Sequence, residues 1–533
     1  MSRASRTATE PVAAASMTHR QVLEALSGLL LGMFVSILAN TVVSTSLPLI
    51  LSDLKGSQSA YTWVVTATLL ATTVSTPIWG KFADLFNRKL LIQLALGVFV
   101  IGSALAGFSQ DAGTLIAFRV LQGLGAGGLV ALSQIIMADI ISPRERGRYA
   151  GLFGAVMALG TIGGPLLGGV VTDAFGWRWN FFIALPVAIV AIVLLQRTLH
   201  LPPRVKRIVR IDYLGAALIT SGVSLLLIWV TLAGSQFGWL SLTSSVMVIG
   251  AVLLLVAAII VEFRAPEPII PLSLFRNHTF SLSTVASLAV GVSLFGTSVY
   301  LSQYMQLARG ATPTESGLLT IPMMGGLLIS STLFGTVISR RGTWKSIMVS
   351  GSVLMLVGTT LLGTLDVNTS LIFVGIYMFI LGAGVGMVMQ NLVVVVQNTI
   401  AVRHLGVATS SVTFFRSLGG AVGVSVMGSI LGSVVTAQIQ DRVGNLGPGN
   451  QANAGRLLGD GVIPQVNLLP DALRIIVETA YGSGVGTIFL ISAPLALVTL
   501  LTVSLLPNYA LGTETGIDRA RNMALASSPK AKP

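Results

Sequence analysis

Cysteine is absent from this chain of 533 residues, and charged side chains are scarce. Without cysteine there can be no disulfide framework, no thiolate nucleophile and no cysteine-ligated metal site. Charged residues make up 10% of the chain, whereas a soluble domain has about 25%, and hydrophobic residues make up 53%. This balance excludes an ordinary soluble domain and predicts an all-α integral membrane protein with many spans.

Motifs of nucleotide-driven and metal-dependent chemistry are also missing. The sequence has no P-loop and no H-E-x-x-H motif, which speaks against an ATP-driven pump and a zinc protease. The run Gly123-Leu-Gly125-Ala-Gly127-Gly128 matches G-x-G-x-x-G, but it follows no strand and lies within an apolar run, so it does not indicate a dinucleotide site. We therefore expect a protein that is not an enzyme and that has no cofactor and no metal site.

Apolar runs of about 20 residues, long enough to cross a bilayer as helices, follow one another along the chain. Polar stretches at 1–26 and 511–533 flank them and are predicted to be disordered. The runs predict fourteen transmembrane helices, at about 27–50, 61–80, 90–109, 113–138, 149–171, 179–197, 212–232, 242–262, 279–302, 315–337, 346–364, 370–396, 406–433 and 483–506.

Basic residues indicate how the chain is oriented. Most of them lie in joints that an even number of spans places on one side, as Arg88, Arg144 and Arg340 do. Because basic loops are retained in the cytoplasm, this pattern predicts a multi-pass protein of the inner (plasma) membrane with both termini cytoplasmic. The formal net charge of +13 is then a consequence of topology, and we expect no nucleic-acid partner.

Short glycine motifs of the first half recur in the second half. Gly125-Ala-Gly127 is echoed by Gly382-Ala-Gly384, Gly163-Gly164 by Gly419-Gly420 and, more weakly, Gly80 by Gly335. Two halves that run in the same direction are typical of parallel-repeat transporters, and the spacing leaves room for two further spans between them. We expect a six-helix bundle at 27–200, two inserted helices at 201–278 and a second six-helix bundle at 279–510.

Glycine and proline gather within the apolar run at 149–171, where Gly160, Gly164 and Gly168 are four residues apart and Pro165 and Gly169 lie beside them. In a soluble helix each glycine would cost about 1 kcal/mol relative to alanine, and proline about 3. In a membrane, a glycine stripe lets another helix approach closely, and the proline permits a bend. The stretch therefore predicts a helix that packs tightly against a neighbour and that moves.

Several stretches resemble motifs of a known transporter family. Gly80-Lys-Phe-Ala-Asp84-Leu-Phe-Asn-Arg88-Lys89 resembles the loop between spans 2 and 3 of the major facilitator superfamily, and Leu115-Ile-Ala-Phe-Arg119-Val-Leu-Gln122-Gly123 resembles its span 4 motif. The stretch 160–169 is similar to the span 5 motif of its antiporters. The stretches 38–48 and 176–179 resemble motifs of the fourteen-helix drug:proton antiporters of EmrB/QacA type. The resemblance implies a major facilitator fold and multidrug efflux by proton antiport.

The resemblance also implies roles for charged residues. Asp84 and Arg88 are four residues apart, so on a helix they share a face and can pair or cap neighbouring helices. With Gly80 they would latch one conformational state, and a simple topology anchor is the alternative. Arg119 lies inside span 4, where a lone guanidinium costs at least about 2.5 kcal/mol. Proton relay or substrate positioning is implied for Arg119, and structural hydrogen bonding is the alternative.

The titratable groups depart from the pattern of that family. Ala39 stands where these antiporters commonly have an aspartate in span 1, and we can place none of the 19 acidic residues at the middle of a span. The 4 histidines lie in or beside segments predicted to be cytoplasmic. Proton coupling needs a group that titrates in the accessible pH range. Asp139, near the end of span 4, is our candidate carrier, and a helix-end role for it is equally open.

Polar residues within the spans are candidates for a substrate cavity, and nearly all of them are neutral. Their lining would be soft and polarizable because methionines lie beside them, which suits bulky hydrophobic or amphipathic molecules. No central carboxylate would offset the desolvation of a dicationic drug. For the one charged candidate, an arginine, a structural role is equally open. The candidates are Asn40, Gln122, Gln134, Tyr300, Gln303, Gln390, Asn391 and Arg416.

We therefore expect a secondary active exporter that works by alternating access, with protons, membrane lipid and small hydrophobic or amphipathic substrates as its partners. Two alternatives stay open: an exporter of an endogenous lipid or cell-envelope component, and a non-transporting membrane sensor or scaffold. The segment 434–482 is predicted to be extracytoplasmic, either as a surface loop or as a contact for a periplasmic partner.

Overall fold

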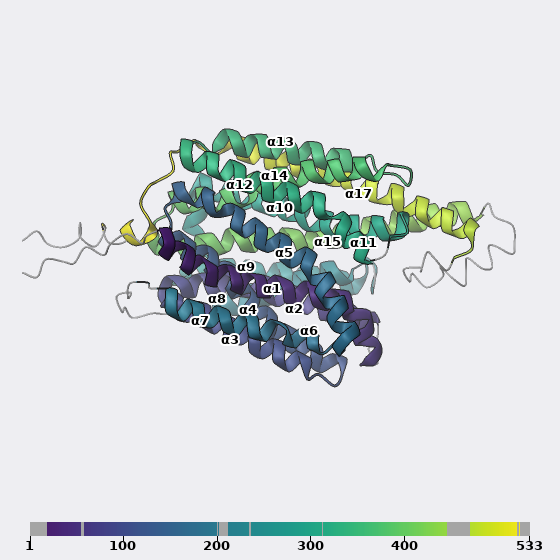
Figure 1. Ribbon diagram of the computed structural model, residues 1–533, viewed down its shortest axis with the longest axis horizontal. Coiled ribbons are helices and arrows are strands. Elements are labelled where there is room, and N and C mark those ends of the chain that lie inside the picture. The colour runs from purple at the N-terminus through teal and green to yellow at the C-terminus, as the bar shows by residue number, and fades with distance from the viewer. Residues whose placement is uncertain are drawn as a thin grey trace, which may run out of the picture.

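The computed structural model describes residues 19–54, 58–199, 201, 212–233, 236–311, 313–444, 469–519 and 522, and these residues are mostly helical. The helices lie side by side along one axis of the molecule (Figure 1). In the described ranges, 13 helices are long and apolar enough to cross a membrane. Helix α2 (Gln58–Leu85) lies among them and is less apolar because it is rich in threonine. With α2 the structure agrees with the predicted fourteen spans.

The first half consists of α1 to α7, and polar caps fix where several of its helices begin. Asn87 accepts hydrogen bonds from the first backbone N–H groups of α3, Asp111 caps α4, and Ser142 caps α5, which has proline at its first position. The bounds are α1 His19–Asp53, α3 Arg88–Gly107, α4 Ala112–Ile140, α5 Pro143–Phe175, α6 Trp179–Phe182 and α7 Ala184–Thr198.

The second half runs from η1 to α17, and an apolar core lies within each half. One core lies among α1, α3, α4, α5 and α7, and the other lies mainly among α10, α12, α13, α14 and α17. The halves form the lower and upper parts of the view (Figure 1). The bounds are η1 Leu272–Arg276, α10 His278–Gln303, the π-helical η2 Tyr304–Ala308, α11 Pro313–Leu319, α12 Ile321–Arg341, α13 Lys345–Leu362, α14 Leu371–Thr399, η3 Val402–His404, α15 Leu405–Gly444 and α17 Asp471–Leu505.

The inserted helices α8 (Tyr213–Leu232) and α9 (Leu242–Arg264) are fastened to both halves. Val223 and Leu227 of α8 share an apolar cluster with Val74 of α2 and Phe414 of α15. Beyond α9, Glu267 forms an ion pair with Lys81 of α2 at 2.8 Å, and Trp239 donates a hydrogen bond to Ser429 of α15 at 2.7 Å. The inserted helices α8 and α9 therefore cover the line along which α2 meets α15.

Two predicted spans are broken helices. The span predicted at 179–197 is divided at Ile183 into α6 and α7, and the span predicted at 315–337 is divided at Thr320 into α11 and α12. A proline follows each break, Pro186 and Pro322, and proline has no N–H to donate to the preceding turn. The span predicted at 279–302 continues as the π-helical segment η2.

The polar stretches at the chain ends are more ordered than predicted. Helix α1 begins at His19, so 19–26 is helical, whereas 1–18 lies outside the described residues. In the tail predicted to be disordered, 511–519 is described and Leu511 is buried. Within 434–482, α15 runs on to Gly444 and α17 begins at Asp471, and the residues 445–468 between them lie outside the described part.

One end of the bundle carries the joints α2–α3, α4–α5, α12–α13 and α14–α15, together with both described ends of the chain. It lies to the left in the view (Figure 1). Most of the basic residues of the joints lie here, and we call it the basic end. The opposite end is the outer end. Close contacts join the two halves at the basic end.

Candidate functional site

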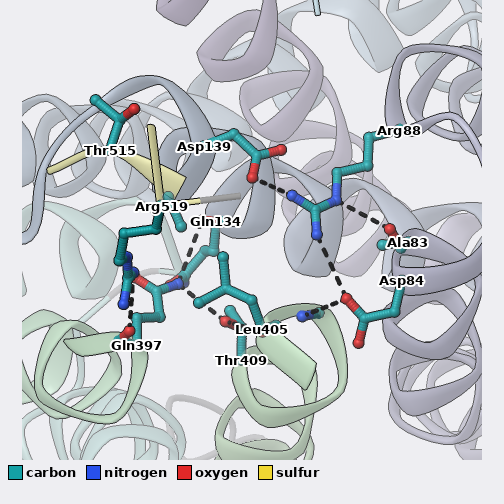
Figure 2. Close-up of polar contacts among 12 residues, drawn as sticks. Ala83, Asp84, Arg88, Gln134, Asp139, Gln397, Leu405, Thr409, Thr515 and Arg519 are labelled. Carbon is teal, nitrogen blue, oxygen red and sulfur yellow. Dashed lines mark hydrogen bonds and ion pairs between the residues drawn. The ribbon is translucent and has the colours of Figure 1, made fainter. Parts of the chain in front are cut away.

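A cluster of charges joins three helices at the basic end (Figure 2). Arg88, the first residue of α3, forms an ion pair with Asp139 of α4, and its other terminal nitrogen lies 3.4 Å from Asp84 Oδ1 of α2. Its Nε donates a hydrogen bond to the Ala83 carbonyl at 2.9 Å. The Arg88 side chain is only 2% exposed, so these oxygens replace the water that a guanidinium would otherwise require.

Asp84 also contacts the second half of the molecule. Its Oδ1 accepts a hydrogen bond from the backbone N–H of Gly406 at 2.8 Å, and its Oδ2 accepts one from Val407 at 2.9 Å. These N–H groups belong to the first turn of α15, where backbone donors lack partners within the helix and the helix dipole is positive. Asp84 therefore caps a helix of the other half while it pairs with Arg88.

Glycines let the two halves touch at this end. A Cβ added to Gly80 would lie 1.8 Å from the Ser410 hydroxyl oxygen and 3.0 Å from the Gly406 carbonyl oxygen, so α2 and α15 are in close contact there. A Cβ added to Gly335 of α12 would lie 2.0 Å from the Gly147 carbonyl oxygen of α5. Gly80 and Gly335 are the positions that the internal repeat relates. The α2–α15 and α5–α12 pairs are therefore closed at the basic end, and we call these contacts, together with the Asp84 cap, the gate.

A second polar contact between the halves is absent from our predictions. Gln397 of α14 is fully buried; its Oε1 accepts a hydrogen bond from Arg146 of α5, and its Nε2 donates to the Thr409 hydroxyl at 2.9 Å and towards the Gln134 carbonyl at 3.4 Å. Arg146 also donates to the Ala138 carbonyl at 2.9 Å. In the sequence Arg146 looks like a basic topology marker, because Gln397 lies 251 residues away.

Arg119 lies among neutral oxygens within the first half. It is 2% exposed, its terminal nitrogen donates a hydrogen bond to Gln122 Oε1 at 2.7 Å, and its Nε lies 3.4 Å from the Val64 carbonyl. Gln122 in turn donates to the Ser103 hydroxyl at 3.2 Å. These bonds give the buried guanidinium neutral partners, as the structural alternative requires. A part for Arg119 in proton relay stays a prediction.

The glycine stripe of α5 lies against α1. A Cβ on Gly160 would lie 2.7 Å from the Ile37 side chain, and one on Gly168 would lie 2.9 Å from the Val42 carbonyl. A Cβ on Gly164 would lie 1.9 Å from the Thr41 hydroxyl oxygen. That hydroxyl donates a hydrogen bond to the Gly160 carbonyl at 2.9 Å. Gly169 has open space around its Cβ position, and the side chain of Pro165 is outside the described part.

The stripe yields a matched pair of substitutions. We expect Gly164→Ala to destabilise the fold by about 1–3 kcal/mol, because the added methyl group must push α5 away from Thr41. Gly163→Ala places the same group where no atom lies within 4 Å, so it should be neutral or slightly stabilising. Thermal unfolding in detergent measures the difference, and equal midpoints for the two variants would contradict the packing of α1 on the stripe.

The residues predicted to line a substrate cavity do not converge on one site. Gln390 of α14 lines a narrow cavity with Met157 of α5, Ser331 of α12 and Met389. Gln134 and Gln122 take part in the contacts of Gln397 and Arg119 described above. Gln390 is therefore the predicted residue that the structure places in a cavity where α5, α12 and α14 meet.

Other candidates are engaged within their own helices or lie at other levels of the bundle. Asn40 donates a hydrogen bond to the Ser36 carbonyl at 3.0 Å, and Asn391 donates to the Met387 carbonyl at 2.7 Å. Near the outer end of α10, Tyr300 donates to the Val424 carbonyl of α15, and Gln303 ends the helix. Arg416 is 7% exposed, and its NH1 has no hydrogen-bond partner among the described residues.

At the outer end, the stretch 176–179 is held to α1. Trp177 Nε1 donates a hydrogen bond to Asp53 Oδ2 at 2.9 Å, and Arg178 donates to the same oxygen at 3.1 Å. The Arg178 guanidinium lies over the Trp177 ring at 4.2 Å, a cation–π contact. The hydrogen bond from Trp177, followed in size of effect by the one from Arg178, holds the pKa of the Asp53 carboxyl below its ordinary value.

The lowered pKa gives this contact a pH dependence. A carboxylate with a depressed folded pKa contributes stability above its unfolded pKa of about 3.9, and this contribution is lost as the pH falls through the folded value. We expect Asp53→Asn to lower the thermal midpoint slightly at pH 7, and we expect the difference from the parent to shrink as the pH falls below the unfolded pKa. The control is Asp471→Asn, whose carboxylate is 92% exposed. A difference in thermal midpoint that does not shrink as the pH falls would contradict the assignment.

The helices form two halves, each with its own apolar core, that meet through close contacts of α2 with α15 and of α5 with α12. Such an arrangement is typical of membrane transporters whose halves rock against each other. The chain belongs to the Major Facilitator Superfamily, whose family model matches residues 29–424. It is therefore a transporter rather than an enzyme, and the superfamily predicted from its motifs is confirmed.

Named relatives and solved structures agree with this assignment. The chain is 34% identical to the multidrug transporter protein MdtP of Bacillus subtilis (strain 168) over 445 residues, which cover 84% of this chain and 78% of MdtP. It is 30% identical to multidrug resistance protein 3 of the same organism over 484 residues, 89% of this chain and 93% of that protein. The human organic anion transporter MFSD10 shares the fold, with a TM-score of 0.62 and 16% identity over 90% of this chain and 99% of MFSD10.

Proposed function

We propose that this transporter exports bulky hydrophobic or amphipathic compounds as a secondary active multidrug exporter. The observation that carries the proposal is Asp84, which caps α15 of one half from α2 of the other. Such a contact can be released without unfolding either half, as alternating access requires. The relatives named multidrug transporters, MdtP and multidrug resistance protein 3, support the class of substrate.

The basic end faces the cytoplasm in this proposal, because basic loops are retained there, and the membrane is the plasma membrane. The structure then corresponds to the form that is closed towards the cytoplasm. In the closed form the cavity beside Gln390, Met157 and Met389 has a volume of only about 10 Å³, so substrate enters after the gate opens. The neutral lining of this cavity suits molecules that partition into lipid.

Proton coupling belongs to the same proposal, with Asp139 as the carrier. Asp139 lies at the basic end in an ion pair with Arg88, not at the middle of the bundle. In this proposal Asp139 carries the proton in the form of the protein in which its ion pair with Arg88 is broken. Because Arg88 also contacts Asp84 of the gate, proton uptake by Asp139 and opening of the gate would favour each other.

The test is efflux from proteoliposomes with an imposed proton gradient, using a fluorescent amphiphilic cation and a neutral amphiphile as probes. We expect export that follows the gradient, a loss of at least tenfold in Asp84→Asn, and export that no longer responds to the gradient in Asp139→Asn. Asp471→Asn, at an exposed carboxylate of the outer end, is the control. Export of neither probe, or full export by Asp84→Asn, would refute the proposal.

A further inference from the structure

After α17 the chain turns along the basic end and is tied to the second half. Trp344, in the joint between α12 and α13, donates its indole N–H to the Tyr509 carbonyl at 2.7 Å. Asn398, near the end of α14, makes two bonds: its Nδ2 donates to the Ala510 carbonyl at 3.1 Å, and its Oδ1 accepts from the Gly512 N–H at 2.8 Å. Residues 509–512 therefore follow the second half closely.

The same segment then crosses to the first half. The Gly512 carbonyl accepts a hydrogen bond from the backbone N–H of Arg144, in the first turn of α5, at 3.1 Å. Gly516 lies on the end of α4, since a Cβ there would lie 2.9 Å from the Ala138 carbonyl and 3.0 Å from Asp139 Oδ1. Ile517 packs against the apolar core of the first half. A larger residue at 516 would lift the segment from α4.

A short helical turn then directs Arg519 back to the contact between the halves. Thr515 and Asp518 cap the turn reciprocally: Asp518 Oδ2 accepts from the Thr515 N–H at 3.1 Å, and the Thr515 hydroxyl accepts from the Asp518 N–H at 3.1 Å. Arg519 donates a hydrogen bond to the Gln397 carbonyl at 3.2 Å (Figure 2). Gln397 is the residue that binds Arg146 across the two halves.

We propose that residues 508–519 form a strap that positions the closed gate, with Gly516 and Arg519 as its positioning residues. The strap binds α14 on one half and α4 and α5 on the other, so all its contacts can exist together only while the basic end is closed. Opening requires release from at least one half. The strap therefore shifts the conformational equilibrium towards the closed basic end, and its loss shifts the equilibrium towards the open form. The proposal rests on the proposed function only in taking opening of this end as a step of transport.

The absence of cysteine allows a direct test with one reporter, Ser410→Cys, because Ser410 is fully buried beneath Gly80 where α2 meets α15. The rate at which a water-soluble maleimide modifies this cysteine in lipid nanodiscs reports how often the basic end opens. We compare the full chain with a chain that ends at Pro507 and with one that ends at Asn522, which keeps the strap. We expect modification about tenfold faster without the strap, the change that follows the loss of one or two net hydrogen bonds, and an unchanged rate in the chain that ends at Asn522.

Point variants distinguish positioning from a general effect on folding. Gly516→Val and Arg519→Ala should accelerate modification several-fold in protein that elutes as a folded monodisperse species, and Arg519→Lys should restore part of the slow rate. Thr513→Val, at an exposed position of the strap, is the matched control. Equal rates for the full chain and the chain ending at Pro507 would overturn the proposal, as would an equal acceleration by loss of 523–533. Modification of the cysteine needs no substrate. If removal of the strap accelerates modification in a protein that exports neither probe, the proposed function is refuted and the strap is not.

Discussion

Replacing Arg88 with alanine is expected to destabilise the protein by about 3–5 kcal/mol, because it leaves two buried carboxylates without the guanidinium that compensates them. The side chains of Asp84 and Asp139 are 5% and 10% exposed, so water cannot replace the lost partner. The repulsion between the two carboxylates also loosens the cap on α15. Thermal unfolding in detergent, together with the yield of monodisperse protein, measures the loss.

The double variant Arg88→Ala/Asp139→Asn is the informative control. Removing the charge of Asp139 leaves one buried carboxylate, Asp84, which keeps its hydrogen bonds from Gly406 and Val407. We therefore expect the double variant to regain part of the stability that the single variant loses. An Arg88→Ala protein with the thermal midpoint of the parent would show that the cluster does not hold these helices together.

Replacing Gly335 with leucine is expected to prevent the basic end from closing and to reduce export at least tenfold. The Cβ position of Gly335 is 2.0 Å from the Gly147 carbonyl oxygen, and a backbone atom cannot move aside as a flexible side chain can. The two halves must separate at α5 and α12. Each half keeps its own core, so we expect a folded protein that favours the open form.

Gly325→Leu is the matched control on the same helix, since no atom lies within 4 Å of its Cβ position. It should export as the parent does. The reporter Ser410→Cys, combined with each substitution, measures opening independently of transport. Slow modification and full export in Gly335→Leu would contradict the assignment of the α5–α12 contact to the gate.

The sequence predicted the pairing of Asp84 with Arg88 but not its geometry. Their four-residue spacing suggested one helical face, whereas Asp84 lies at the end of α2 and Arg88 begins α3 after the cap Asn87. The further partners of Asp84 are backbone N–H groups of α15, and no side-chain pattern marks a backbone group. The glycine stripe was easier to predict, because its function depends on residue size and helical spacing.

Contacts between distant segments account for what the sequence did not reveal. Gln397 and Arg146 carry no local motif, and the strap is polar enough to resemble a disordered tail. Its order comes from Trp344 and Asn398, which lie more than a hundred residues earlier in the chain. Among the polar residues expected in a cavity, composition could not separate those bound within a helix, such as Asn391, from Gln390, which lines one.

The most direct test of the account is to link the two halves reversibly at their contact. A Cβ on Gly154 of α5 would lie 3.0 Å from the Ser331 hydroxyl oxygen of α12, so Gly154→Cys/Ser331→Cys in this cysteine-free chain should form a disulfide. Efflux is measured in proteoliposomes before oxidation, after oxidation and after reduction. The account predicts that oxidation reduces export at least tenfold and that reduction restores it. Undiminished export by a completely cross-linked protein would contradict the claim that the halves must part for transport.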